Sequence, residues 1–148
     1  MKGKVPKLPL TPEERRILRS QKIKLSAIAS FQPRDLALVL GCTEERAKHF
    51  IALAQFQTIP SVGPDLAKHV IDLGVYSLAE LKGKDPAKLF DQLERLYGFR
   101  IDPCVEDGIR LIVHNAETSH SEKRWWDFTE ERKLYRQKHG YPDTRPKR

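Results

Sequence analysis

The chain has 148 residues and a formal net charge of +7, which is enough for one domain of typical size with a single hydrophobic core and short tails. No apolar run approaches the roughly 20 residues of a membrane-spanning helix, and no apolar stretch of a secretory signal follows the basic N-terminus. The two cysteines, Cys42 and Cys104, lack CxxC or metal-like spacing, so we expect reduced thiols in a cytoplasmic protein that does not associate with membranes.

The positive charge is concentrated at the two ends of the chain. Residues 1–24 carry eight Lys and Arg against two Asp and Glu, a net charge of +6. Residues 25–110 carry ten against twelve, a net charge of −2, and residues 111–148 carry nine against six, a net charge of +3. Because affinity for nucleic acid is largely electrostatic, we expect the ends to attract an anionic partner. The other interpretation is a solvated surface that aids solubility.

Residues 1–24 are expected to form a basic arm and a helix. Residues 1–10 contain prolines and lysines without periodicity, which is typical of a flexible segment. Thr11 as N-cap, Pro12 at the first helical position and Glu14 at the third make a capping-box pattern. This pattern predicts a helix from Pro12 to about residue 24.

Residues 25–117 are expected to form a domain of short helices, because apolar side chains recur at helical spacing between capping residues. Convincing β-alternation is absent. The predicted helices cover residues 33–40, 44–56, 64–73, 86–97 and 103–117.

Residues 118–148 are expected to contribute an additional C-terminal helix over residues 122–138 and a disordered, Pro-rich basic tail over residues 140–148. Trp125 and Trp126 lie near the start of this helix. The tryptophans either clamp the helix onto the core or stack on exposed nucleic-acid bases.

A tight turn over residues 59–63 joins two of the predicted helices. Gly63 is expected to take a positive φ, and Pro64 suits the first position of a helix, where its missing N–H costs nothing. Ile59 and Val62 are expected to fill the gap between the two helices. The free N–H groups at the start of the second helix then offer a site for an anion.

This arrangement resembles the helix-hairpin-helix motif, which binds DNA through the sugar-phosphate backbone without reading the sequence. Strong DNA binders of that kind usually have Gly where Ser61 stands, and a basic or hydroxyl residue where Asp65 and Leu66 stand. Asp65 favours the helix dipole but repels a phosphate at the same place. The hairpin therefore either contacts phosphate or serves only as a packing unit.

The turn, the helix that follows it and the basic C-terminal helix supply the candidate site. At the turn we expect the backbone amides of Val62 and Gly63 to donate to phosphate, with Lys68 and His69 one helical turn further on. The candidate nucleic-acid-binding residues are Ser61, Val62, Gly63, Lys68, His69, Lys123, Arg124, Arg132, Lys133 and Arg136.

Several further segments make the resemblance more specific. They are residues 59–63, 71–74, 77–86, 89–93 and 101–105, Arg110, and residues 125–127. Together they resemble a family of small bacterial helix-hairpin-helix proteins labelled pathogenicity-locus or mitomycin-resistance proteins. The resemblance covers about residues 56–128 and implies a helical hairpin fold and a link to DNA. It implies no known reaction and no catalytic residue.

The fold class expected from these observations is all-α, a compact multi-helix domain built on helix-hairpin-helix motifs of the five-helix SAM-like type. The expected function is non-enzymatic, sequence-independent binding of DNA or another nucleic acid, with a role in DNA repair or damage resistance. The alternative is a protein–protein adapter with structural hairpins and incidental basic tails. A protein partner therefore stays open beside nucleic acid.

No catalytic, metal or cofactor site is expected from the sequence. The five histidines lack zinc-site spacing, and no Gly-rich phosphate loop of the P-loop type is present. Cys104 and His114 would lie about 15 Å apart on one helix, too far for a nucleophile and its base. We therefore expect no enzymatic activity and no small-molecule substrate.

Overall fold

The computed structural model describes residues 4–118 and 121–148, and these residues form helices and irregular segments without a strand. The prediction of an all-α fold is therefore confirmed. Residues 1–3 of the predicted arm and residues 119–120 lie outside the described residues. Three short 3-10 helices, η1 to η3, accompany the α-helices. The order is α1 (Pro12–Ser20), η1 (Leu25–Ser30), α2 (Pro33–Leu40), α3 (Glu44–Phe56), α4 (Pro64–Asp72), η2 (Leu78–Leu81), α5 (Pro86–Tyr97), α6 (Pro103–Glu117), η3 (Trp125–Phe128) and α7 (Thr129–His139).

Local signals place most helix starts. Thr11 forms the predicted capping box with Glu14, accepting from the Glu14 amide while the Glu14 carboxylate accepts from the Thr11 amide. The side chains of Thr43, Asp85 and Asp102 likewise accept from amides in the first turns of α3, α5 and α6. These bonds satisfy N–H groups that a helix start leaves unpaired.

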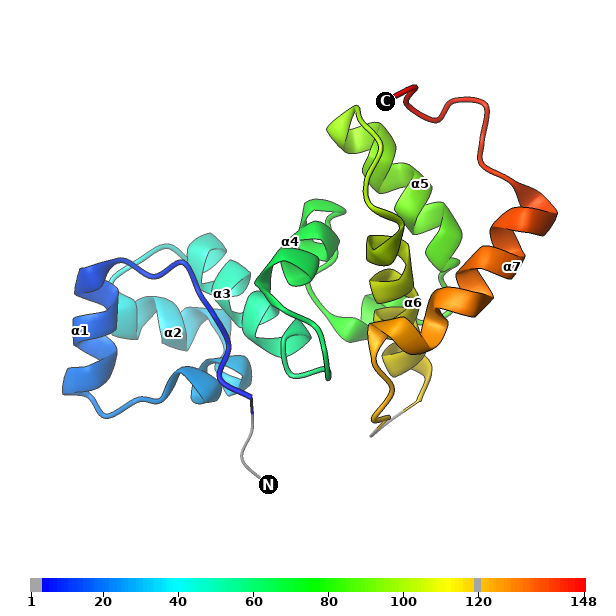
Figure 1. The fold of residues 1–148 in the computed structure, drawn as a ribbon. Coiled ribbons are helices and arrows are strands. Elements are labelled where there is room, and N and C mark those ends of the chain that lie inside the picture. The colour runs from blue at the N-terminus through cyan, green and yellow to red at the C-terminus, as the bar shows by residue number, and fades with distance from the viewer. Residues whose placement is uncertain (1–3, 119–120) are drawn as a thin grey trace.

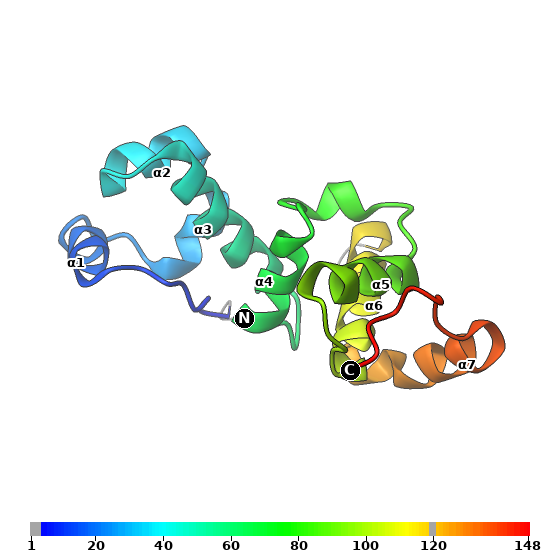
Figure 2. The same cartoon turned by 90° about the horizontal axis from the view of Figure 1, so that it is seen from above.

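The chain is arranged around two long helices. These are α3 and α6. In Figures 1 and 2, α1 and α2 lie with α3 at one end of the molecule, α5 and α7 lie with α6 at the other end, and α4 lies between the two groups. Phe50 and Phe56 of α3 are 1% exposed, and Ile109 and Ile112 of α6 are at most 1% exposed. The buried apolar side chains of both ends form one continuous cluster. The predicted division of the chain into segments that end at residues 24 and 117 stays a prediction.

Helix α6 packs tightly against α4. Eight consecutive residues of α6, 106–113, are buried, so the helix is covered over its whole circumference. Gly108 permits this approach, since a Cβ at Gly108 would lie 2.5 Å from a methyl carbon of Leu66. The second helix of the hairpin is therefore fixed against the C-terminal half of the molecule.

The predicted flexible arm is packed over its described part. Leu8 and Leu10 are buried at 4% and 8% exposure. The side chain of Gln57, itself buried, accepts from the Lys7 amide at 3.0 Å and donates to the Lys7 carbonyl at 2.9 Å. Two apolar anchors and this pairing hold the segment beside α3, so the prediction of a free arm is wrong for these residues.

The C-terminal tail is also held by contacts that its composition does not reveal. Arg145 donates to Glu94 at 2.8 Å. Tyr141 lies under two guanidinium groups, at 4.1 Å from Arg136 and 3.6 Å from Arg145. The prediction of disorder is therefore wrong, because ion pairing and cation–π contacts replace the missing apolar anchors. The helix predicted over 122–138 is also divided, into η3 and α7.

Candidate nucleic-acid interface

The segment between α3 and α4 forms a tight turn. The amide of Val62 donates to the carbonyl of Ile59 at 3.1 Å, Pro60 occupies the second position, and Ser61 has a φ of 66° at the third. This is the pattern of a type II turn. Ile59 and Val62 are 5% and 0% exposed and belong to the hydrophobic core cluster, as expected of side chains that fill the space between the two helices.

The residue with positive φ is Ser61, and the prediction for Gly63 is wrong. Gly63 has a φ of −95° and is the N-cap of α4. The third position of a type II turn favours glycine because a Cβ is strained there. This accounts for the glycine that strong DNA binders place where Ser61 stands, and Ser61 bears the strain in this chain.

The turn leaves a set of backbone amides free. The prediction that the Val62 amide contacts phosphate is wrong, because that N–H closes the turn. The amides of Ser61, Gly63, Asp65 and Leu66 find no acceptor among the described residues. No side chain caps α4, so its start leaves N–H groups unpaired at the positive end of the helix dipole.

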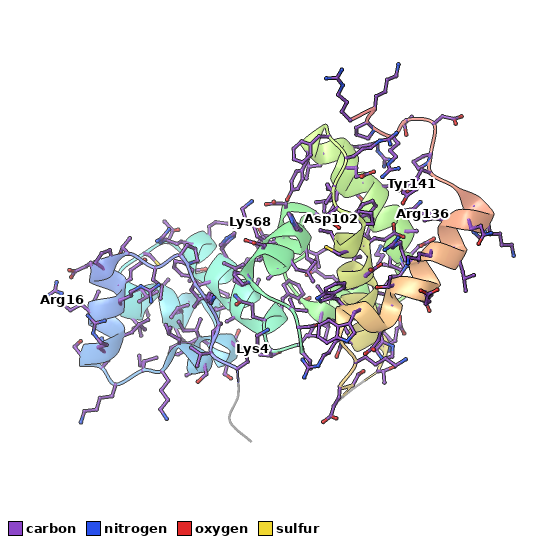
Figure 3. All side chains as sticks on the ribbon, in the orientation of Figure 1. Lys4, Arg16, Lys68, Asp102, Arg136 and Tyr141 are labelled. Carbon is purple, nitrogen blue, oxygen red and sulfur yellow. The ribbon has the colours of Figure 1, made fainter. Side chains whose placement is uncertain are left out.

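Two cations from distant parts of the chain meet at this turn. The ammonium group of Lys4 donates to the carbonyl of Val62. Burial, and after it the charge of Arg124, lowers the pKa of Lys4, so the two cations lie within reach of each other's field. Neither forms an ion pair with an acid of the described residues. In Figure 3, Lys4 lies on the side of the molecule where the turn and the loop before η3 project.

The loop before η3 is tied to the turn by a direct hydrogen bond. The amide of Trp125 donates to the hydroxyl of Ser61 at 2.9 Å. Lys123 and Arg124 are exposed beside it. Together these groups form a surface that we call the basic corner. It consists of Lys4, Ser61, Gly63, Lys123 and Arg124.

Two acidic residues border the basic corner: Asp127, whose carboxylate accepts from the Arg124 amide at 2.9 Å, and Asp65 at the start of α4. Asp65 lines a pocket of about 280 Å³ together with Ser61, Gly63 and Trp125. A carboxylate at this place weakens the attraction for an anion, as the sequence predicts.

Lys68 lies away from the basic corner, whereas His69 lines the same pocket as Ser61 and Gly63. Lys68 is paired with Asp72 at 3.0 Å, and Figure 3 shows it on the opposite side of α4 from Lys4. His69 shares a hydrogen bond of 2.8 Å with the hydroxyl of Tyr97, and burial lowers its pKa. A neutral imidazole adds no positive charge, so the basic corner is defined without these two candidates.

The arginines of α7 are occupied by carboxylates, contrary to the free basic helix predicted from sequence. Arg132 donates to Asp107 at 2.8 Å, and Arg136 donates to Glu106 at 3.0 Å and to Asp91 at 2.9 Å. Arg110 of α6 also donates to Glu106, at 3.3 Å. We call Arg110, Arg132 and Arg136 with these carboxylates the arginine cluster.

The arginine cluster is buried. Arg136 is 7% exposed and Glu106 is fully buried, and burial raises the pKa of Glu106 despite its two guanidinium neighbours. The guanidinium groups of Arg132 and Arg136 therefore hold α7 on α6 and are not presented to a ligand. Lys133 of the same helix points outward, 58% exposed and 3.8 Å from Glu130.

The two tryptophans have different environments. Trp125 packs against the core cluster, whereas Trp126 is 52% exposed. The two rings meet edge to face, with centroids 5.4 Å apart and planes at 83°. Of the two interpretations, clamping fits Trp125, while Trp126 keeps an open aromatic surface.

Among the described residues, no group of three or more His, Cys, Asp and Glu side chains gathers as a metal site would require. Cys104 has its pKa raised to about 11, mainly by burial, which disfavours the nucleophilic thiolate. His114 shares a hydrogen bond of 3.0 Å with Ser121. Within residues 4–118 and 121–148, no helix has the length and apolar character that are needed to cross a bilayer.

Sequence reasoning missed Lys4 as a member of the site. The high Lys and Arg content of residues 1–24 marks the segment as basic, but no local pattern predicts a contact between Lys4 and Val62. Lys123 and Arg124 were identified by their charge and their proximity to the tryptophans.

Residues 50–134 match the model of a protein family described as "Pathogenicity locus". Over 76 residues the chain is 33% identical to "Mitomycin resistance protein McrB" of Streptomyces lavendulae, a match that covers 51% of this chain and 71% of the relative. No solved structure matches the chain significantly. The family match includes the turn and both tryptophans, whereas Lys4 lies outside it.

Proposed function

The chain belongs to the pathogenicity locus family, and from that premise we propose that it is a non-enzymatic, cytoplasmic DNA-binding protein. In this proposal the α3–turn–α4 unit acts as a helix-hairpin-helix motif and contacts the sugar-phosphate backbone without reading sequence. One relative is named a mitomycin resistance protein, and we propose a role in DNA repair or damage resistance for this chain as well.

The observation that carries the proposal is the basic corner. Free amides of the turn and of the start of α4 lie beside cations that no described acid neutralises. A phosphate accepts hydrogen bonds from such amides and is attracted by such cations. These contacts go to the backbone of the nucleic acid, so they position the protein without specifying a base.

The test is a salt series of duplex DNA binding, measured by fluorescence anisotropy. The double variant Lys4→Ala/Arg124→Ala is expected to reduce the slope of log affinity against log salt by about 2, since each lost phosphate contact removes about 1. Lys82→Ala/Lys84→Ala is the matched control, because both lysines are exposed and lie outside the basic corner. An unchanged slope in the first variant, or undetectable binding by the natural protein, contradicts the proposal.

A substitution at Asp65 is expected to strengthen DNA binding, in contrast to the removal of Lys4 and Arg124. Asp65→Lys replaces the one acidic group that lines the pocket beside the turn and is expected to raise duplex affinity several-fold at low salt. Loss of the favourable charge at the start of α4 costs roughly 0.5 kcal/mol of stability. If Asp65→Lys leaves affinity unchanged, the phosphate does not approach the start of α4.

A protein–protein adapter is the second candidate function, and the exposed acidic Asp65 supports it. An adapter would recover a stoichiometric protein partner in a pull-down after nuclease treatment. The Lys4→Ala/Arg124→Ala variant would retain that partner, although its salt-dependent affinity for DNA would fall.

A further inference from the structure

We propose that Trp126 is a stacking platform for an unpaired base, so that the protein prefers single-stranded or locally unpaired DNA to intact duplex. The inference rests on the proposed function and deepens it, because it adds a base contact to the phosphate contacts of the basic corner. Bases in a duplex are covered on both faces by their neighbours. A protein aromatic ring therefore stacks on bases that have left the duplex.

The first observation is the exposure of Trp126. Tryptophan side chains bury a large apolar area when they serve only the core. Trp125 follows this rule, but the adjacent Trp126 is 52% exposed. The apolar surface of its indole is therefore available to a flat partner.

The second observation is that the ring is held in place. Trp125 meets Trp126 edge to face and is fixed by the bond from its amide to the Ser61 hydroxyl. The carboxylate of Asp127 accepts from the Arg124 amide at 2.9 Å and closes the first turn of η3. A platform that is already ordered loses little conformational entropy on binding.

The third observation is the position of the ring beside cations that suit a nucleotide. The guanidinium of Arg124 lies 5.7 Å from the centre of the Trp126 ring, and Arg124 belongs to the basic corner. Trp126 is also linked to the turn, because its ring contacts Trp125 and the Trp125 amide donates to the hydroxyl of Ser61. A nucleotide whose phosphate binds at the turn places its base near an exposed aromatic ring, as stacking platforms in single-strand binding proteins require.

The test compares a labelled oligothymidine with a duplex hairpin of the same number of nucleotides. The natural protein is expected to bind oligothymidine more tightly. Trp126→Ala is expected to lower oligothymidine affinity on the order of tenfold, as loss of one stacked base does, and to leave duplex affinity within about twofold. Phe99→Ala is the matched control, since Phe99 is an exposed aromatic residue at 53% that lies outside the basic corner.

Intrinsic fluorescence provides an independent measurement, because the chain contains only two tryptophans. Trp125→Phe keeps an aromatic ring in the core and leaves Trp126 as the single reporter. Oligothymidine is expected to quench this signal, and the duplex is expected to leave it nearly unchanged.

The outcomes separate this inference from the proposed function. If the natural protein binds DNA but Trp126→Ala weakens neither form, or weakens both equally, the stacking role is overturned and phosphate binding stands. If the natural protein binds neither form, the proposed function fails and the inference falls with it. Selective loss of oligothymidine binding in Trp126→Ala, but not in Phe99→Ala, supports the platform.

Discussion

The basic corner and the arginine cluster contain the same kinds of positive side chain in opposite states. In the arginine cluster, Arg132 and Arg136 lie 14% and 7% exposed against buried carboxylates. In the basic corner, Lys4 and Arg124 lie within range of each other's charge, and neither side chain forms an ion pair with an acid of the described residues. A basic stretch of sequence therefore contributes to stability or to binding according to where its counter-charges lie.

The largest effect is expected when the arginine cluster is broken. Arg136→Met keeps the apolar stem of the side chain but removes the guanidinium charge that pairs with the carboxylates of Glu106 and Asp91. Removing one partner of a buried ion pair costs about 3–5 kcal/mol. We expect this loss in the free energy of unfolding, measured by urea denaturation.

Lys133→Ala is the matched control for the arginine cluster, because Lys133 is exposed on the same helix. Its effect is expected to stay within about 0.5 kcal/mol. Equal effects of the two variants would contradict the distinction between the two regions. DNA affinity per folded molecule is expected to stay unchanged in both.

A smaller effect is expected at an ion pair in which one partner is exposed. Glu14 is 8% exposed and pairs with Arg46, which is 40% exposed. The hydrogen bond from Arg46 is the main cause that lowers the pKa of Glu14 from 4.5 to about 2. Because the folded-state pKa lies below the unfolded value, the stability it contributes is present above pH 4.5 and is lost as the pH falls toward 2.

The measurement is the free energy of unfolding against pH for the natural protein and Glu14→Gln. The two are expected to differ by at most about 3 kcal/mol near neutral pH and to converge in acid. A difference that does not shrink with falling pH would show that the Glu14 charge is not the source of the stability.

The smallest effect is expected within the basic corner, at Ser61. Ser61→Gly relieves strain of roughly 1 kcal/mol at a φ of 66° but loses the bond to the Trp125 amide, which is worth a similar amount. Its net change in stability is therefore expected to be near zero.

Ser61→Ala keeps the strain and loses the same bond, so it is expected to be about 1 kcal/mol less stable than Ser61→Gly. Thermal unfolding of both variants checks the difference. If the alanine variant is as stable as the glycine variant, Ser61 is not strained.

Much of the fold follows from local sequence patterns. The capping box at Thr11 and the predicted helix starts at residues 44, 86 and 103 are confirmed. The family resemblance over residues 56–128 is confirmed by the match over residues 50–134. The proposed DNA contact and its residues remain predictions.

The sequence by itself determined where the helices begin, that the chain is all-α and which family it belongs to, because caps, prolines and apolar spacing act within one or two helical turns. Only the tertiary structure decided which cations are free. Arg132 and Arg136 on α7 meet carboxylates of α5 and α6, whereas Lys4 meets the turn between α3 and α4. Coulomb and hydrogen-bond energies depend on separation in space, and composition records only separation along the chain.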